Sequence, residues 1–241
     1  MRLETIKKAI SEISGLSLSD FSISEDLFLT FENKTFPLAP WRFDRRLMAM
    51  RTLAVEDCVL RQVCSYKSVR ISNCSENIEN AIRTELDVLE WMLDDKITSV
   101  YAVANSDRTM SIILQTQKNV LCNIEIALTL SDDTRPITRH EMVGIEGMIS
   151  DRSINEQVPF EAVYLFNKDK KNPETYTDME AYLFGLDPFE VAVAENVLDI
   201  VTNPGSAKTK CLNLDRIKYL SACVYESAAK GQKIKTEVTA L

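Results

Sequence analysis

The chain has 241 residues, of which 45% are hydrophobic and 27% charged, enough to bury one large domain or one domain with a small appendage. Its formal net charge of -8 argues against nucleic acid and anionic membranes as partners, because both bind basic surfaces. No apolar run is long enough to span a bilayer and the first residues lack the apolar core of a secretion signal, so we expect a cytoplasmic protein.

The first 50 residues are predicted to form a short N-terminal appendage. Residues 3–13 place apolar side chains at helical spacing, residues 20–36 alternate as one or two strands, and residues 41–50 favour a helix. The few apolar positions cannot offset the chain entropy of an independent fold. We therefore expect residues 1–50 to pack on the main domain and not to fold alone.

Residues 51–241 are predicted to form one α+β domain. Consecutive runs of strands, with helices before and after them, favour a largely antiparallel mixed sheet with helices on one face. Asp187-Pro188 reads as the start of a helix, and Gly231 as the end of the last one. The expected strands are residues 59–71, 98–104, 110–115, 119–130, 138–149, 158–166 and 176–184; the expected helices are residues 77–93, 187–203 and 213–230.

The two faces of the predicted strand at residues 119–130 differ in polarity. One face is wholly apolar from Val120 to Leu130, and helices are expected to cover it. The other face mixes apolar and polar residues, and together with neighbouring strands it gathers Tyr101, Val103, Ile113 and Leu121. A mixed surface of this kind is typical of an interface, so we expect a homo-oligomer, most simply a dimer, formed through this open face. A solvated face on a monomer and a face that binds a different, full-length subunit are the alternatives.

Motifs for a nucleotide or a metal are missing. The six glycines contain no GxGxxG or P-loop pattern, and the close pair Gly144 and Gly147 favours a tight turn or a bulge. The six cysteines form no CxxC pair and are expected to be reduced and mostly buried. The single histidine, His140, has no accompanying nucleophile motif and is interpreted as a packed or surface residue. We expect no bound cofactor and no metal.

Four segments in order resemble the glucose–fructose oxidoreductase/inositol dehydrogenase (Gfo/Idh/MocA) family. The first resembles the family's passage from a helix through Asp-Leu-Leu-x-Trp to a strand, and the last its closing helix with Ser-Ala-x-x-Gly. The segments are residues 87–104 (DVLEWMLDDKITSVYAVA), 119–127 (NVLCNIEIA), 141–151 (EMVGIEGMISD) and 214–233 (LDRIKYLSACVYESAAKGQK). The resemblance covers the chain from about residue 55 onward.

The resemblance implies the substrate-binding and oligomerisation domain of a dehydrogenase. Family members carry a Rossmann domain before it, and the first 50 residues are too short to hold one. The family's lysine in Glu-Lys-Pro is missing, because no proline here follows a lysine. Counting back from Trp91, Asn80 and Thr84 stand where the family has Asp and His, whereas Asp87 is kept. An amide or a hydroxyl cannot act as the general base, so we expect no catalytic and no cofactor-binding residues.

Two clusters remain as candidate binding residues. Asn80, Thr84, Asp87 and Trp91 share one helix face and could line a remnant pocket for a sugar-like ligand; the alternative is a packed helix with a polar rim. Four arginines, at positions 42, 45, 46 and 51, could clamp an anion, although a surface paired with the chain's surplus acids is favoured.

Two functions follow from these predictions. The preferred one is a non-catalytic oxidoreductase-like protein, a pseudoenzyme that binds a partner subunit or a sugar-like ligand and assembles through its sheet. The alternative is a substrate-binding subunit of an NAD(P)-dependent sugar dehydrogenase whose cofactor domain comes from another chain. The alternative needs a partner that supplies both the cofactor site and the base that Asn80 and Thr84 do not offer.

Overall fold

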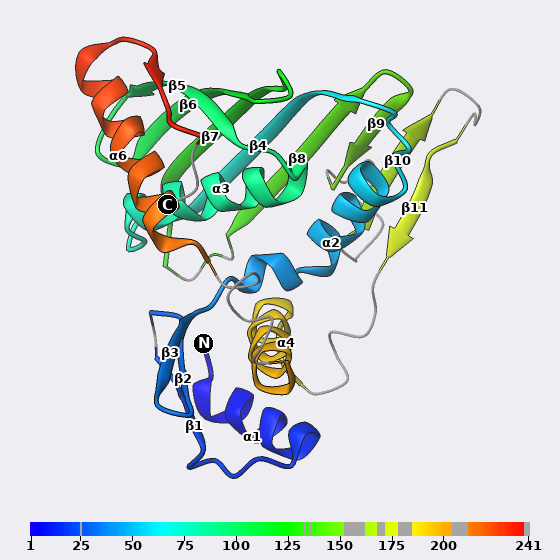
Figure 1. Cartoon of the computed structure of the whole chain (residues 1–241), viewed down its shortest axis with the longest axis vertical. Coiled ribbons are helices and arrows are strands. Elements are labelled where there is room, and N and C mark those ends of the chain that lie inside the picture. The colour runs from blue at the N-terminus through cyan, green and yellow to red at the C-terminus, as the bar shows by residue number, and fades with distance from the viewer. Residues whose placement is uncertain are drawn as a thin grey trace. The chain divides into compact units, whose positions relative to one another are not determined.

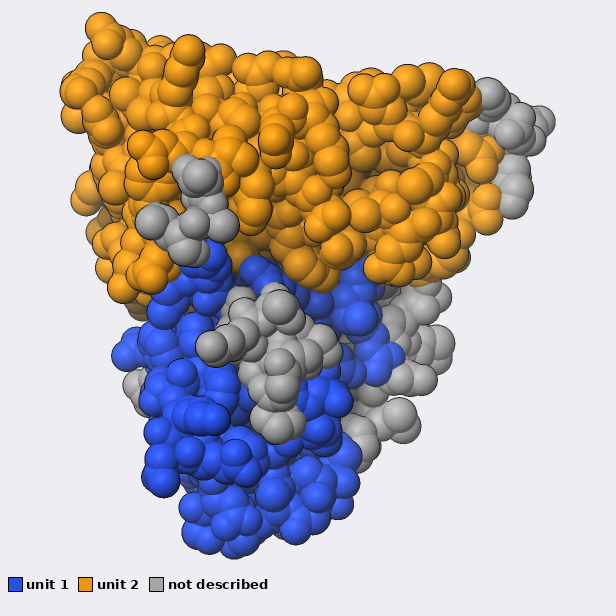
Figure 2. Space-filling model, in the orientation of Figure 1, with its two compact units in different colours: residues 1–48, 178–214 blue, residues 49–177, 215–241 orange. Residues whose placement is uncertain are grey.

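The computed structural model describes residues 1–24, 26–132, 134, 136–151, 162–167, 172–177, 185–203 and 212–238. The chain divides into two compact units, coloured separately in Figure 2. Unit 1 comprises residues 1–48 and 178–214, and unit 2 comprises residues 49–177 and 215–241. Within the described residues, no helix has the length and apolar character that crossing a membrane requires.

Unit 1 combines two helices with a small antiparallel sheet. Helix α1 (Leu3–Ser14) confirms the helix predicted for residues 3–13. Strands β1 (Phe21–Ile23), β2 (Phe28–Phe31) and β3 (Lys34–Pro37) pair in chain order. The sequence predicted one or two strands here; the third arises because Glu32 and Asn33 adopt positive φ angles and turn the chain back within two residues. A 3₁₀ turn, η1 (Pro40–Phe43), follows.

Helix α4 (Pro188–Thr202) completes the core of unit 1. Asp187 and Glu190 form the expected helix start as a capping box, and Pro188 occupies the first turn. Val193 and Val197 of α4 are buried in one cluster with Ile6 of α1 and Leu29 of β2. The sequence predicts this helix within residues 51–241, whereas the structure groups residues 178–214 with residues 1–48. The apolar stripe of α1 and the buried apolar residues of α4 shield each other from water.

Unit 2 contains a nine-stranded mixed sheet, which confirms the predicted α+β class. Helix α2 (Arg45–Arg51) leads into it through a π-helical turn, η2 (Thr52–Glu56). β4 and β7 are parallel, and the other paired strands are antiparallel. The strands, in spatial order, are β11 (Glu174–Thr177), β10 (Ala162–Asn167), β9 (Gly147–Ser150), β8 (Ile137–Gly144), β4 (Val63–Asn73), β7 (Leu121–Leu130), β6 (Thr109–Thr116), β5 (Ile97–Ala104) and β12 (Ile234–Lys235).

The strand predicted for residues 138–149 is a hairpin of β8 and β9. Gly144 and Gly147 bracket its turn, as expected for a turn and not for a phosphate loop. A Cβ atom on Gly147 would lie 2.0 Å from the Phe166 carbonyl oxygen, and one on Gly144 would lie 2.5 Å from the Gln62 carbonyl oxygen. Both glycines therefore permit close backbone approach. Residues 158–161 and 178–184, also predicted as strand, lie outside the described residues.

Helices α3 (Ile78–Leu93) and α6 (Leu214–Lys230) cover one face of this sheet (Figure 1). Asn77 caps the start of α3, and Gly231 follows α6 with a left-handed φ of 61°, as predicted. The covered face of β7 is the apolar one, with Cys122 and Ile124 fully buried. The described part of the opposite face carries no helix in Figure 1.

Candidate functional site

The four residues predicted to line a remnant pocket lie along α3 in unit 2. Asn80 is exposed, Thr84 and Trp91 are half-buried, and Asp87 is buried at 3% exposure. The Trp91 ring lies under the guanidinium of Arg51, whose central carbon is 5.5 Å from the ring centroid. Burial of Asp87 and coverage of Trp91 by Arg51 fit the packed-helix interpretation. A sugar-like ligand at this helix stays a prediction.

The predicted arginine clamp consists of paired side chains. Arg45 contacts Glu195 at 3.1 Å and Arg46 contacts Asp44 at 2.9 Å in unit 1. In unit 2, Arg51 lies 3.8 Å from Asp94. These pairings fit the interpretation of a surface balanced by the chain's surplus acids.

A buried polar cluster beneath α3 was not predicted. His140 of β8 is 2% exposed, and its Nδ1 lies 3.1 Å from Oδ2 of Asp151. Its Nε2 lies 3.7 Å from Oε2 of Glu85, which makes that contact an ion pair and not a hydrogen bond. Glu85 of α3 also accepts a hydrogen bond from the Ser68 hydroxyl and lies 3.6 Å from Arg70, both on β4. The cluster thus joins α3 to the two central strands β4 and β8.

Electrostatics make His140 a charged residue in the folded protein. Burial alone would lower its pKa, but Asp151 and Glu85 outweigh burial and raise the pKa of His140 to about 9. For Glu85, burial opposes ionisation, yet His140, Arg70 and Ser68 together keep its pKa below the ordinary value. His140 and Arg70 thus lie among carboxylates, which include Glu76 at 2.8 Å from Arg70. The neighbouring Tyr66 is fully buried, and burial raises the pKa of its phenol well above the usual range.

The buried cluster has the chemistry of a structural network. His140, Glu85, Asp151 and Ser68 are each at most 4% exposed, so a substrate cannot reach them in this conformation. The burial of His140 fits its interpretation as a packed residue. Sequence reasoning missed Glu85, Ser68 and Asp151 because the pairing of β4 with β8 and the packing of α3 on the sheet bring them together from separate elements. Among the described residues, no group of three or more His, Cys, Asp and Glu side chains could hold a metal ion.

The cysteines differ from the expectation of mostly buried thiols. Cys58, Cys64 and Cys74 are free and exposed, and Cys122 and Cys223 are free and buried. Position 211 lies outside the described residues. The exposed thiols sit near the ends of β4, where the chain enters and leaves the sheet. A hydrophobic residue at a strand end need not face the core, which is why burial was overestimated.

The open face of the nine-stranded sheet is the most distinctive surface of unit 2. Strand pairing aligns Tyr101, Ile113 and Asn123 in one row, with Lys67 next to Asn123. Leu121, at the start of β7, is 59% exposed, and Ile113, within β6, is 46% exposed. The exposed large apolar side chains of this face are Tyr101, Val103, Ile113, Leu121, Ile137 and Val143. The alignment predicted for Tyr101, Val103, Ile113 and Leu121 is confirmed.

Polar groups are interspersed on the same face. Lys67 lies 3.9 Å from Glu125, and the Asn123 amide donates to Glu125 at 3.2 Å. A shallow concavity of about 230 Å³ adjoins them, with Val69, Ser111 and Glu125 among its lining residues. This hollow lies across the sheet from α3, so it is separate from the four residues predicted as a remnant pocket.

No family model matches the sequence, and no curated protein matches it. Solved structures of oxidoreductases do match. Levoglucosan dehydrogenase, in a complex with NADH and levoglucosan, superposes with a TM-score of 0.65 at 11% identity over 82% of this chain and 65% of that chain. An oxidoreductase from Agrobacterium radiobacter, in complex with NAD+, L-tartaric acid and magnesium, gives 0.63 at 13% identity over 82% and 63%. An oxidoreductase domain protein from Kribbella flavida gives 0.60 at 13% identity over 82% and 64%.

These neighbours define the class of fold. They are oxidoreductases of the Gfo/Idh/MocA type, so the resemblance seen in the sequence is confirmed at the level of the fold. The present chain spans less than two thirds of the length of the first oxidoreductases it matches.

Proposed function

We propose that this chain is a non-catalytic relative of these oxidoreductases that acts by assembling with a second copy through the open face of its sheet. The observation that carries the proposal is the group of exposed apolar side chains on that face, which includes Tyr101, Ile113 and Leu121. A fully solvated sheet face would carry charged residues there, because exposed Leu121 and Ile113 cost free energy in water.

The composition of the face supports contact with a second copy. Apolar residues surround Asn123, Glu125 and Lys67, a mixture typical of interfaces. The pairing of Lys67 with Glu125 within one chain already compensates both charges, so burying them leaves no unpaired ion. A two-fold axis would bury the same patch on both copies at once.

The residues on α3 support the absence of catalysis. Proton abstraction from an alcohol requires a base that titrates near neutral pH, and Asn80 and Thr84 offer an amide and a hydroxyl. Asp87 is buried, and Arg51 covers Trp91. The His140 imidazolium lies buried below the helix and is held by two carboxylates.

Sedimentation velocity at low micromolar concentration tests the assembly. We expect a dimer for the wild type and a folded monomer for Ile113→Glu and Leu121→Glu. Tyr225→Glu is the matched control, because Tyr225 is an exposed apolar residue on α6, away from the open face, and should leave the dimer intact. Ile124→Glu should unfold the chain, since Ile124 is fully buried. A monomeric wild type, or a dimer that both face variants preserve, would refute the proposal.

Calorimetric titration with NAD and with NADP tests the absence of catalysis. We expect no saturable heat, because the sequence contains no glycine-rich phosphate loop. Saturable binding at micromolar dinucleotide would instead favour a working dehydrogenase subunit.

A further inference from the structure

The C-terminal segment closes the edge of the nine-stranded sheet at β5. β12 is only two residues long and pairs with Val100 and Ser99. Beyond β12 the chain continues along β5: the Thr236 N–H donates to the Thr98 carbonyl at 2.9 Å, and the Thr236 hydroxyl donates to the Ile97 carbonyl at 2.5 Å. Backbone groups that an edge strand normally leaves free are therefore bound.

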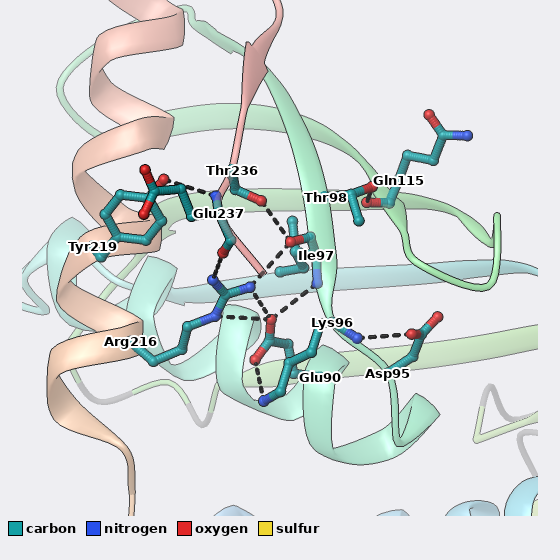
Figure 3. A network of polar contacts seen from close by, with 10 residues as sticks. All are labelled: Glu90, Asp95, Lys96, Ile97, Thr98, Gln115, Arg216, Tyr219, Thr236 and Glu237. Carbon is teal, nitrogen blue, oxygen red and sulfur yellow. Dashed lines mark hydrogen bonds and ion pairs between the residues drawn. The ribbon is translucent and has the colours of Figure 1, made fainter. Parts of the chain in front are cut away.

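A buried ion pair holds this segment in place (Figure 3). Arg216 of α6 donates to Glu90 of α3 at 2.7 Å and to the Ile97 carbonyl at 3.0 Å, and it also donates to the Glu237 carbonyl. Glu90 in turn accepts from the Ile97 N–H at 3.0 Å. Arg216 is 4% exposed and Glu90 7%. One guanidinium thus links two helices, the sheet edge and the C-terminal segment.

The other end of the segment is fixed at the end of α6. Ser227 accepts a hydrogen bond from the Ala102 N–H of β5 at 3.0 Å, and its hydroxyl donates to the Gln232 carbonyl at 2.6 Å. Gly231, with a φ of 61°, lets the chain leave α6 and return along β5. Ser227 thereby satisfies one backbone N–H of β5. It also orients the C-terminal segment, which pairs with the remainder of β5.

Without the C-terminal segment, β5 would be an exposed edge strand that could pair with another chain. It is eight residues long, and its side chains include Val100, Tyr101 and Val103. A long edge strand with apolar, β-branched residues is a template for pairing with another chain. Because desolvating Glu90 and Arg216 costs free energy, their ion pair adds little net stability. Its role is instead to fix the C-terminal segment in one position along β5.

We propose that residues 232–238 act as a clasp that prevents β5 from pairing edge to edge with a second copy. Arg216, Glu90 and Ser227 hold the clasp closed. The clasp restricts self-association to surfaces other than this edge. That the permitted surface is the open face rests on the proposed function; the blocking of the edge does not.

Two truncated chains test the clasp. The chain ending at Gly231 lacks it, whereas the chain ending at Val238 retains it and serves as the matched control. We expect the chain that ends at Gly231 to keep its helical circular dichroism signal. It should form oligomers larger than those of the full chain, and the size of these oligomers should increase with protein concentration. Amide hydrogens of Val100 and Ala102 should change their exchange protection only in that chain. Addition of a synthetic peptide of residues 231–238 should suppress the larger species.

If the truncated chain does not fold, a point variant of the full chain tests the same proposal. Thr236→Pro removes both hydrogen bonds from Thr236 to β5 and leaves Arg216 and Glu90 unchanged. Both experiments are repeated in chains that also carry Ile113→Glu. This substitution disrupts contacts through the open face, so association through the β5 edge can be measured separately. If the larger oligomers persist in the presence of Ile113→Glu, they support the clasp proposal, whether or not the protein dimerises through its open face. The clasp proposal is overturned if folded clasp-deficient chains keep the association state of the full chain.

Discussion

His140 links the stability of the protein to pH. Its pKa is raised to about 9 in the folded state, above its ordinary value of 6.5. The stabilisation is therefore fully present below pH 6.5 and is lost as pH rises through 9. We expect the free energy of unfolding, measured in urea, to fall over this window by an amount on the order of 3 kcal/mol.

The partner carboxylate provides the matched variant. Asp151→Asn removes the charge that raises the pKa of His140 and should flatten the pH dependence. Because one buried partner is lost, stability at pH 6 should also fall by about 3–5 kcal/mol. His140 is the only histidine, so its titration can be followed directly by NMR. An imidazole that titrates near 6.5 in the wild type would contradict this prediction.

The residues of this cluster show where sequence reasoning fails. The covered side of β4 carries Tyr66, Ser68, Arg70 and Ser72, and polar residues in alternation normally indicate a solvent face. Tertiary pairing overrides that pattern because Glu85 and His140 supply complementary charges from other elements. The apolar side of β7 follows the ordinary rule, and its burial was predicted correctly.

At the level of elements, α1 and α4 depend on each other. Ile10 of α1 and Ile200 of α4 are fully buried in the same cluster. Ile10→Ala and Ile200→Ala should each lower the free energy of unfolding of unit 1 by about 2–5 kcal/mol. Ile13→Ala is the control, because Ile13 is more than half exposed and its loss should cost at most about 0.5 kcal/mol. Urea titration followed by circular dichroism measures all three.

The same core explains why residues 1–50 are not expected to fold alone. A peptide of these residues would lack α4 and leave Ile6, Ile10 and Leu29 exposed. We expect such a peptide to unfold without a cooperative thermal transition. A chain in which α4 is joined to residues 1–50 by a flexible linker should regain cooperativity. A cooperative, monomeric transition in the short peptide would contradict the prediction.

An ion pair at the start of α4 adds an acid-sensitive contact. Arg2 hydrogen-bonds Glu190 through both its side chain and its backbone N–H, and these bonds lower the pKa of Glu190 to about 2. A lowered carboxyl pKa contributes stability above pH 4.5 that is lost as pH falls toward 2. Arg2→Ala should therefore shift the acid-unfolding midpoint upward, with Lys7→Ala as the control for loss of a cation. Equal midpoints in the two variants would rule out this role for Arg2.

Local signals determined how well the elements could be predicted. Caps at Asn77, Asp187 and Gly231 are encoded within a few residues, so the ends of α3, α4 and α6 were placed closely. The turn at Gly144 and Gly147 was predicted, but the strands β8 and β9 were predicted as one strand, because Val143 and Met148 continue the strand pattern across the turn. The grouping of α4 with α1 depends on a long-range contact, and no local pattern indicates it.

For the whole molecule, net charge should control association. Each copy carries a formal charge of -8, so two copies repel each other at low ionic strength. Raising the salt concentration from about 0.01 M to about 0.1 M shortens the Debye length from about 30 Å to about 10 Å. The dissociation constant of the dimer, measured by sedimentation equilibrium, should therefore decrease. An increase would mean that ion pairs between copies dominate the contact.

The discontinuous composition of unit 1 has a consequence for synthesis on the ribosome. Residues 1–48 emerge before α4, on which their core depends, and α4 follows only after most of the sheet of unit 2 has been made. At roughly 5–20 residues per second, the wait is on the order of ten seconds. During that time the apolar stripe of α1 has no permanent partner. The nascent N-terminal segment is thus the part of this protein that a chaperone near the exit tunnel would be expected to shield.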